Sequence, residues 1–205
     1  MNAAITADIV NSTSMNDAAF SMLMKDLEQC FKQDKVEFYR GDSFQVFIKD
    51  AEKALLKCVK SRLLAILYTE QTRIDIRLSV SIGVLRSDVV NMGSNMEEIF
   101  VNSGRQFDKF QNSSRRLYIN CGNTEKDFTY EIIAEYVDSL LDRLTARQAE
   151  VLYYLLSENT QAETAGLLKL TPATISNHVR AARYEEIKSM LNKFKILTNQ
   201  LKDGK

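Results

Sequence analysis

The segment Thr160–Val179, TQAETAGLLKLTPATISNHV, constrains the fold of this chain most strongly, because it predicts two short helices joined by a tight turn. In the first helix, Ala165 and Leu168 lie at helical spacing, and Ala165 is small where the two helices must approach closely. Thr171 is a good N-cap for the second helix. Pro172 falls at the first helical position, where its missing N–H has no consequence.

The second of these helices has an apolar side and a polar side. Ile175 and Val179 form a narrow apolar stripe. The other side carries short, polar or basic side chains, which suit contacts with phosphates and base edges in a major groove. The predicted DNA-binding residues are Thr171, Ala173, Thr174, Ser176, Asn177, His178, Arg180 and Arg183.

The same segment resembles the helix-turn-helix of LuxR-type regulators and of the fourth region of sigma factors. The resemblance extends upstream through LTARQAEVLYYLL, Leu144–Leu156, and runs without a gap through ATISNHVRAAR. It implies that the second helix enters the major groove of double-stranded DNA. One departure is Lys169, where these families usually have Gly, because a positive φ would strain Lys. The alternative is an ordinary helical hairpin without a DNA role.

Upstream of this segment, the hydrophobic pattern predicts an α+β body. The apolar run 2–10, rich in β-branched residues, indicates a buried central strand. Helical spacing covers 14–32 and 50–71, a hairpin lies between them over 36–48, and an alternating strand follows over 73–85. The order β-α-β-β-α-β is the ferredoxin-like pattern, an antiparallel sheet with helices on one face.

The rest of the body connects this sheet to the helix-turn-helix. The pattern predicts a helix over 96–110, a strand over 116–120 and an amphipathic joining helix over 125–144. Thr145 and Gln148 form a capping box, which starts a new helix.

Two domains are therefore expected. Residues 1–142 would form a ferredoxin-like domain for sensing or dimerisation, and 143–205 an all-α helix-turn-helix domain for DNA binding. With one Pro and seven Gly the chain offers no flexible linker, so both parts should move together. We expect the last residues, 193–205, to be a fraying helix end.

Two carboxylates mark a candidate metal site in the body. Asp8 ends the first strand and Asp42 lies at the hairpin tip, so both could reach one point at the sheet edge and bind Mg²⁺. The turn Asn11, Ser12 and Thr13 leads into the first helix, where backbone N–H groups would cradle the phosphates of a nucleotide. The alternative is that the two Asp residues are only a turn cap and a hairpin tip.

A second resemblance supports this site. ITADIVNST and GDSFQ are similar to the two metal-binding segments of class III nucleotidyl cyclases, and closer still to the SatD family, as is SGRQFDKF. The resemblance spans 3–120 and implies a cyclase-like fold, with Arg105 as a further phosphate contact. Phe38 stands where cyclases carry a base-selecting Lys, and Asn102 and Arg105 are three apart instead of four. Because phosphoryl transfer depends on positioned cations, we expect no catalytic residues.

Charge and cysteine content agree with a DNA-binding protein inside the cell. The net charge of the chain is zero, but residues 144–205 carry nine Lys or Arg against six Asp or Glu, so this part of the chain is mildly basic. Three Cys without CxxC spacing indicate reduced thiols and a cytoplasmic location. The sequence has no apolar run of about 18 residues and no signal-peptide pattern, so no membrane association is expected.

The leading hypothesis is a DNA-binding transcriptional regulator that acts as a homodimer. Its cyclase-like domain would bind a small nucleotide ligand or dimerise, without turnover. One alternative is an active nucleotide cyclase or related phosphotransferase with a DNA-binding tail. Another is a protein-interaction module that does not bind DNA.

Overall fold

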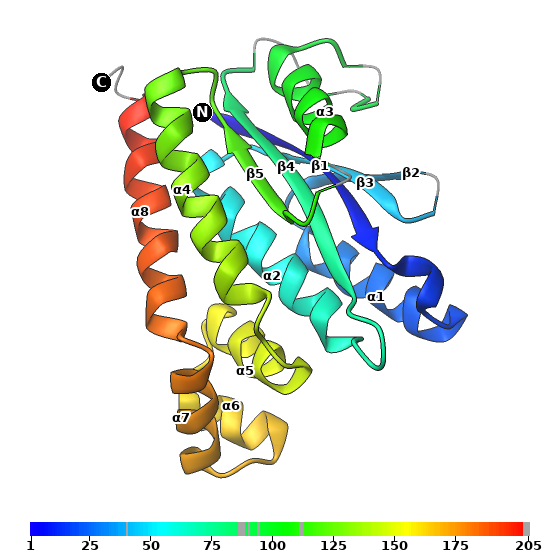
Figure 1. Ribbon diagram of the computed structural model, residues 1–205, viewed down its shortest axis with the longest axis vertical. Helices are drawn as coiled ribbons and strands as arrows, with labels where there is room; N and C mark the ends of the chain where they lie inside the picture. The colour runs from blue at the N-terminus through cyan, green and yellow to red at the C-terminus, as the bar shows by residue number, and fades with distance from the viewer. Residues whose placement is uncertain (40, 86–88, 90, 94, 111–112, 203–205) are drawn as a thin grey trace.

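The computed structural model describes residues 1–39, 41–85, 89, 91–93, 95–110 and 113–202. It is an α+β structure built on one five-stranded sheet (Figure 1). The strands are β1 (Asn2–Val10), β2 (Lys35–Tyr39), β3 (Ser43–Ile48), β4 (Asp75–Gly83) and β5 (Leu117–Asn120). Their order is β2-β3-β1-β4-β5, and only β4 and β5 are parallel. The alternating run 73–85 thus forms a strand shorter than predicted.

Helices cover both faces of this sheet. In chain order they are α1 (Asp17–Cys30), α2 (Ala54–Leu67), α3 (Glu98–Phe110), α4 (Thr124–Leu141), α5 (Ala146–Leu156), α6 (Gln161–Leu168), α7 (Pro172–Ala181) and α8 (Tyr184–Lys202). Figure 1 shows α1 and α2 on one side of the sheet and α3 on the other.

The two helices of the ferredoxin-like pattern, α1 and α2, thus lie on one face as expected, but the later helix α3 covers the other face, and the alternation along β1 shows why. Ala3, Ile5 and Ala7 belong to the core formed with α1 and α2. Ala4 points the opposite way and packs in a smaller cluster with Ile99 and Phe100 of α3. Because successive strand side chains point to opposite faces, α3 must lie on the second face.

Two predicted helices begin later than expected because each is preceded by a 3₁₀ turn. Ser12–Ser14 forms the first turn, and Asn16 then caps α1 by accepting a hydrogen bond from the Ala19 N–H at 2.8 Å. Ala51–Lys53 forms the second turn before α2. The side chain of Asp50 makes no capping hydrogen bond there.

The main core continues from the sheet body into the C-terminal helices. Ala149 and Leu152 of α5 and Ile187 and Phe194 of α8 belong to the same buried cluster as the sheet. Figure 1 shows α8 running beside α4 along its length. The prediction of a fraying end from Lys193 is wrong, because Phe194 is fully buried and Thr198 shares a hydrogen bond of 3.0 Å with Tyr130 of α4.

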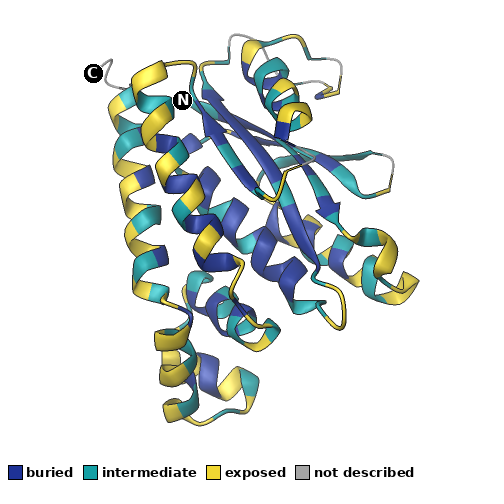
Figure 2. Ribbon diagram, in the orientation of Figure 1, coloured by how far each residue is buried: buried dark blue, intermediate teal, exposed yellow. Residues whose placement is uncertain are grey.

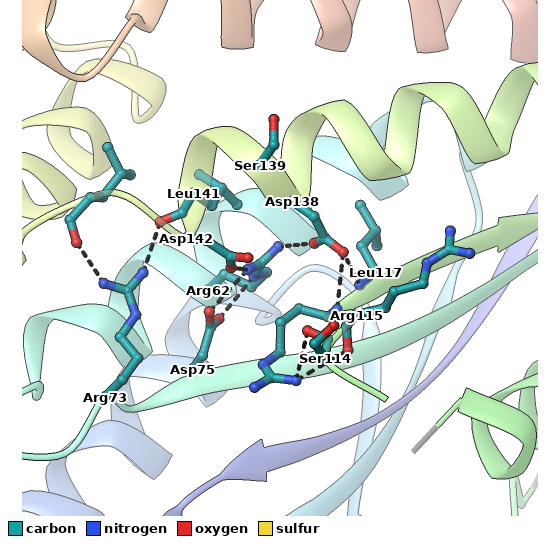
Figure 3. A network of polar contacts seen from close by, with 12 residues as sticks. Arg62, Arg73, Asp75, Ser114, Arg115, Leu117, Asp138, Ser139, Leu141 and Asp142 are labelled. Carbon is teal, nitrogen blue, oxygen red and sulfur yellow. Dashed lines mark hydrogen bonds and ion pairs between the residues drawn. The ribbon is translucent and has the colours of Figure 1, made fainter. Parts of the chain in front are cut away.

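A buried ionic network joins α2, β4 and α4 where the chain enters α5 (Figure 3). Arg62 is fully buried and donates to Asp75 at 2.8 and 2.9 Å, to Asp142 at 3.1 Å and to Asp138. Asp138 also accepts hydrogen bonds from the backbone N–H groups of Arg116 and Leu117, at the start of β5. Arg73 donates to the carbonyls of Leu141 and Leu144 at the end of α4. We call Arg62, Arg73, Asp75, Asp138 and Asp142 the junction network.

Candidate functional site

Helices α5, α6 and α7 pack around a small apolar cluster of their own. Val151 and Leu155 of α5, Ala165 of α6 and Ile175 of α7 form its buried centre. Ala165 is small at the point where α6 approaches its neighbours, as the sequence predicts. The cluster fixes the inner side of α7, so the opposite side of that helix faces solvent.

The turn between α6 and α7 has a defined geometry. Lys169 adopts a left-handed backbone with φ 53° and ψ 42°, and the Leu170 N–H donates to the Ala165 carbonyl at 2.9 Å. These are features of a helix end that usually contains Gly. Thr171 then caps α7 by accepting from the Thr174 N–H at 3.1 Å, and Pro172 is the first helical residue. The predicted capping and the strained Lys are both confirmed.

Four of the predicted DNA-binding residues form the exposed side of α7. Ala173, Ser176, Asn177 and Arg180 are exposed, and Figure 2 shows this side of the helix open to solvent. Arg180 donates to the Asn177 side chain at 2.9 Å. A methyl, a hydroxyl, an amide and a guanidinium group are thus presented together on one helix surface.

Of the other four predicted DNA-binding residues, Thr171 and Arg183 are exposed, whereas Thr174 and His178 are half-buried. The Thr171 and Thr174 hydroxyls share a hydrogen bond of 2.8 Å with each other. Arg183 follows α7 and is an ion-pair partner of Glu186, whose hydrogen bond raises the pKa of Arg183. The structure therefore groups the surface around Asn177 and Arg180 and holds Arg183 against α8.

The two predicted metal ligands lie close together, but each carboxylate has a protein partner. Burial raises the pKa of Asp8, Arg77 opposes this and the nearby charge of Asp42 adds to it. Asp8 Oδ2 pairs with Arg77 at 3.5 Å, and Asp42 Oδ2 accepts from Ser12 at 2.7 Å. No cluster of three or more metal-ligating side chains exists among the described residues. This donor set suits an ion pair better than a metal ion, because a cation already occupies one oxygen of Asp8.

The predicted phosphate-binding residues do not form one group. Ser12 belongs to a 3₁₀ turn and donates to Asp42, and Asn11 donates to the Arg73 carbonyl at 2.8 Å. Thr13 is exposed in this turn, several residues before α1 begins. Arg105 is exposed on α3, which packs over the half of β1 that contains Ala4 and Thr6. The turn follows the other end of β1.

Asp8 belongs to a set of polar residues on the sheet face below α3, and the sequence did not single out the other four. Thr6 stands between Gln45 and Ser79 in the strand register, and Asp8 stands opposite Arg77. We call these five residues the polar floor. Alternation along β4 predicts one buried face, but Ser79 is also fully buried. One sequence signal could have indicated that this sheet face is covered: the helix predicted over 96–110 has an apolar side, and that side must pack against another surface.

Comparison with known proteins gives no identification, because the chain matches no family model, no curated protein and no solved structure. In the described part of the chain, no helix combines the length and apolar character that a membrane span requires.

Proposed function

We propose that this chain is a DNA-binding transcriptional regulator and that α7 reads the major groove. The observation that carries the proposal is the exposed side of α7, held outward by the cluster around Ile175. An Asn can pair with adenine edges and an Arg with phosphate or guanine, so Asn177 and Arg180 have the chemistry for this task. The tight turn at Lys169 supports a helix-turn-helix.

The sheet body is proposed to be a ferredoxin-like domain that controls the DNA-binding unit. The order β2-β3-β1-β4, with antiparallel neighbours throughout, supports this assignment, and β5 extends the sheet. The shared core and the junction network connect the body rigidly to α5 and α8. A change in the body would therefore reach α7 through packed elements instead of a flexible linker.

A homodimer would present two copies of α7 to two half-sites. On the joining helix α4, Ile133 and Val137 are buried against the body, whereas Phe128 and Ile132 are more than half exposed. Ile132 also lines an apolar groove with Tyr136 of α4 and Met190 and Leu197 of α8, and this surface supports pairing.

DNA affinity measured against salt concentration tests the proposal. Arg180→Ala should weaken binding to any duplex and reduce the slope of log affinity against log salt by about 0.9, because one phosphate contact is lost. Lys53→Ala removes an exposed positive charge from the sheet body and is the matched control. Absence of salt-dependent binding by the intact chain, or equal slopes in both variants, would contradict the proposal.

A further inference from the structure

The polar floor lies on a side of the sheet where an apolar surface would be expected; Ser79 is fully buried and the other four residues are half-buried. α3 covers part of this face through Ile99 and Phe100, and the Ser103 hydroxyl of α3 shares a hydrogen bond of 3.0 Å with Thr6. A helix that only covers a sheet needs apolar residues beneath it. Covering by α3 therefore does not explain why hydroxyl, amide and charged groups occupy this sheet face.

Several atoms of the polar floor have no hydrogen-bond partner. Within the described part of the chain, the buried unpaired atoms here are Asp8 Oδ1, Gln45 Oε1, Arg77 Nε and Ser79 Oγ. Native proteins leave few buried polar groups unpaired, and each one asks for an explanation. Four such atoms on adjacent strand positions point to a molecule that pairs with them.

The floor is open at one end and closed at the other. Side-chain exposure is 26% for Asp8 and 14% for Arg77, and Ser79 is 0% exposed. The open end lies where β1 leaves the area covered by α3, beside the β2–β3 hairpin (Figure 1). A ligand would therefore approach the floor from the edge at Asp8.

The chemistry of the unpaired atoms defines the class of ligand. Asp8 Oδ1 and Gln45 Oε1 only accept hydrogen bonds, Arg77 Nε only donates, and the Ser79 hydroxyl does both. Because Asp8 and Arg77 pair with each other, the floor has no net charge. We infer that it binds an uncharged, polyhydroxylated small molecule, since each hydroxyl of such a ligand both donates and accepts. An anion would leave the two acceptors unpaired.

This chemistry is found in a free monosaccharide or cyclitol and in the ribose of a nucleoside. Calorimetric titration of the full chain with D-glucose, D-ribose, myo-inositol and adenosine separates these sources. At least one probe should bind in the millimolar range or tighter and raise the melting temperature. Working at millimolar concentration avoids the general stabilisation that concentrated sugars give to any protein.

Two serine variants make the test specific. Ser79→Ala should weaken binding of that probe at least tenfold while leaving the ligand-free melting temperature unchanged or higher, because it removes an unpaired hydroxyl. Ser61→Ala is the control: Ser61 is also fully buried but donates to the Cys58 carbonyl at 2.9 Å on α2. This variant should lower the melting temperature and keep the affinity.

Three results would overturn the inference. The first is that none of the four probes binds the intact chain. The second is that Ser79→Ala binds the probe as tightly as the unchanged protein does. The third is a fall in the ligand-free melting temperature of Ser79→Ala as large as that of Ser61→Ala, which would mean that the Ser79 hydroxyl has a partner within the protein. The inference does not depend on DNA binding.

Discussion

Replacing Arg62 with Met should destabilise the protein more than any surface ion-pair variant. Arg62 is fully buried and neutralises Asp75 and Asp138, which are also buried. Removal of one partner leaves uncompensated buried charge, at a cost of about 3–5 kcal/mol in the free energy of unfolding. For a chain of this size each kcal/mol lowers the melting temperature by about 2–4 °C, so a fall of about 6–20 °C is expected.

The loss should also depend on pH. Burial raises the pKa of Asp138 above its ordinary value of 3.8, and the charge of Arg62 opposes that rise. A raised carboxyl pKa means that the folded state holds a proton that the unfolded state has released, so stability falls as pH rises through that window. Without Arg62 the folded-state pKa of Asp138 rises further, so the pH range over which stability is lost extends to higher pH. The deficit of Arg62→Met should therefore be smaller at pH 5 than at pH 7.5.

Urea unfolding followed by circular dichroism at both pH values measures this effect. Arg147→Met is the control, because Arg147 forms an exposed pair with Glu150 three residues along α5. Such pairs contribute about 0.2–1 kcal/mol. A loss in Arg62→Met no larger than in this control, or a deficit that is the same at both pH values, would refute the assignment of the junction network as a buried charge cluster.

Three further predictions concern the turn, the dimer and the acidic pair. Lys169→Gly should stabilise the protein by about 0.5–1 kcal/mol, because the steric strain relieved at this left-handed position exceeds the conformational entropy that Gly loses on folding. Thermal unfolding that shows no gain would argue against strain at Lys169. Ile132→Glu should shift sedimentation from dimer to monomer at tens of micromolar protein, and a monomeric unchanged chain would end the dimer proposal. Because Asp8 already pairs with Arg77, Mg²⁺ should shift the melting temperature equally in the unchanged protein, in Asp8→Asn and in Asp42→Asn, whereas a gain that both variants lose would show that the two carboxylates bind the metal.

The sequence predicted the segment that forms α6, the turn and α7 closely because its signals are local. The cap at Thr171, Pro172 at the first helical position and the small Ala165 each act within a few residues, and all three have the predicted roles. The capping box at Thr145 is present for the same reason. Helix ends and turns depend on neighbours in the chain, so one sequence contains most of the information.

Long-range packing was predicted less well. The run after Lys193 has a weak apolar pattern, and Phe194 is buried through long-range packing in the main core, including its ring contact with Tyr130 of α4. The placement of α3 on the second sheet face depends on Gly83, where a Cβ would lie 2.5 Å from the Ile99 side chain. No local rule shows that this glycine allows a helix to approach, or that Ser79 would be buried beneath the same face.

The central claim is that α7 recognises DNA sequence, and selection from a random duplex library tests it most directly. The intact chain should enrich one motif, with two half-sites if it is a dimer. Asn177→Ala should enrich a motif that has lost preference at one base position per half-site, at a cost of about 1–3 kcal/mol there, because one bidentate base contact is removed. No enriched motif from the intact chain, or an identical motif from Asn177→Ala, would contradict the account.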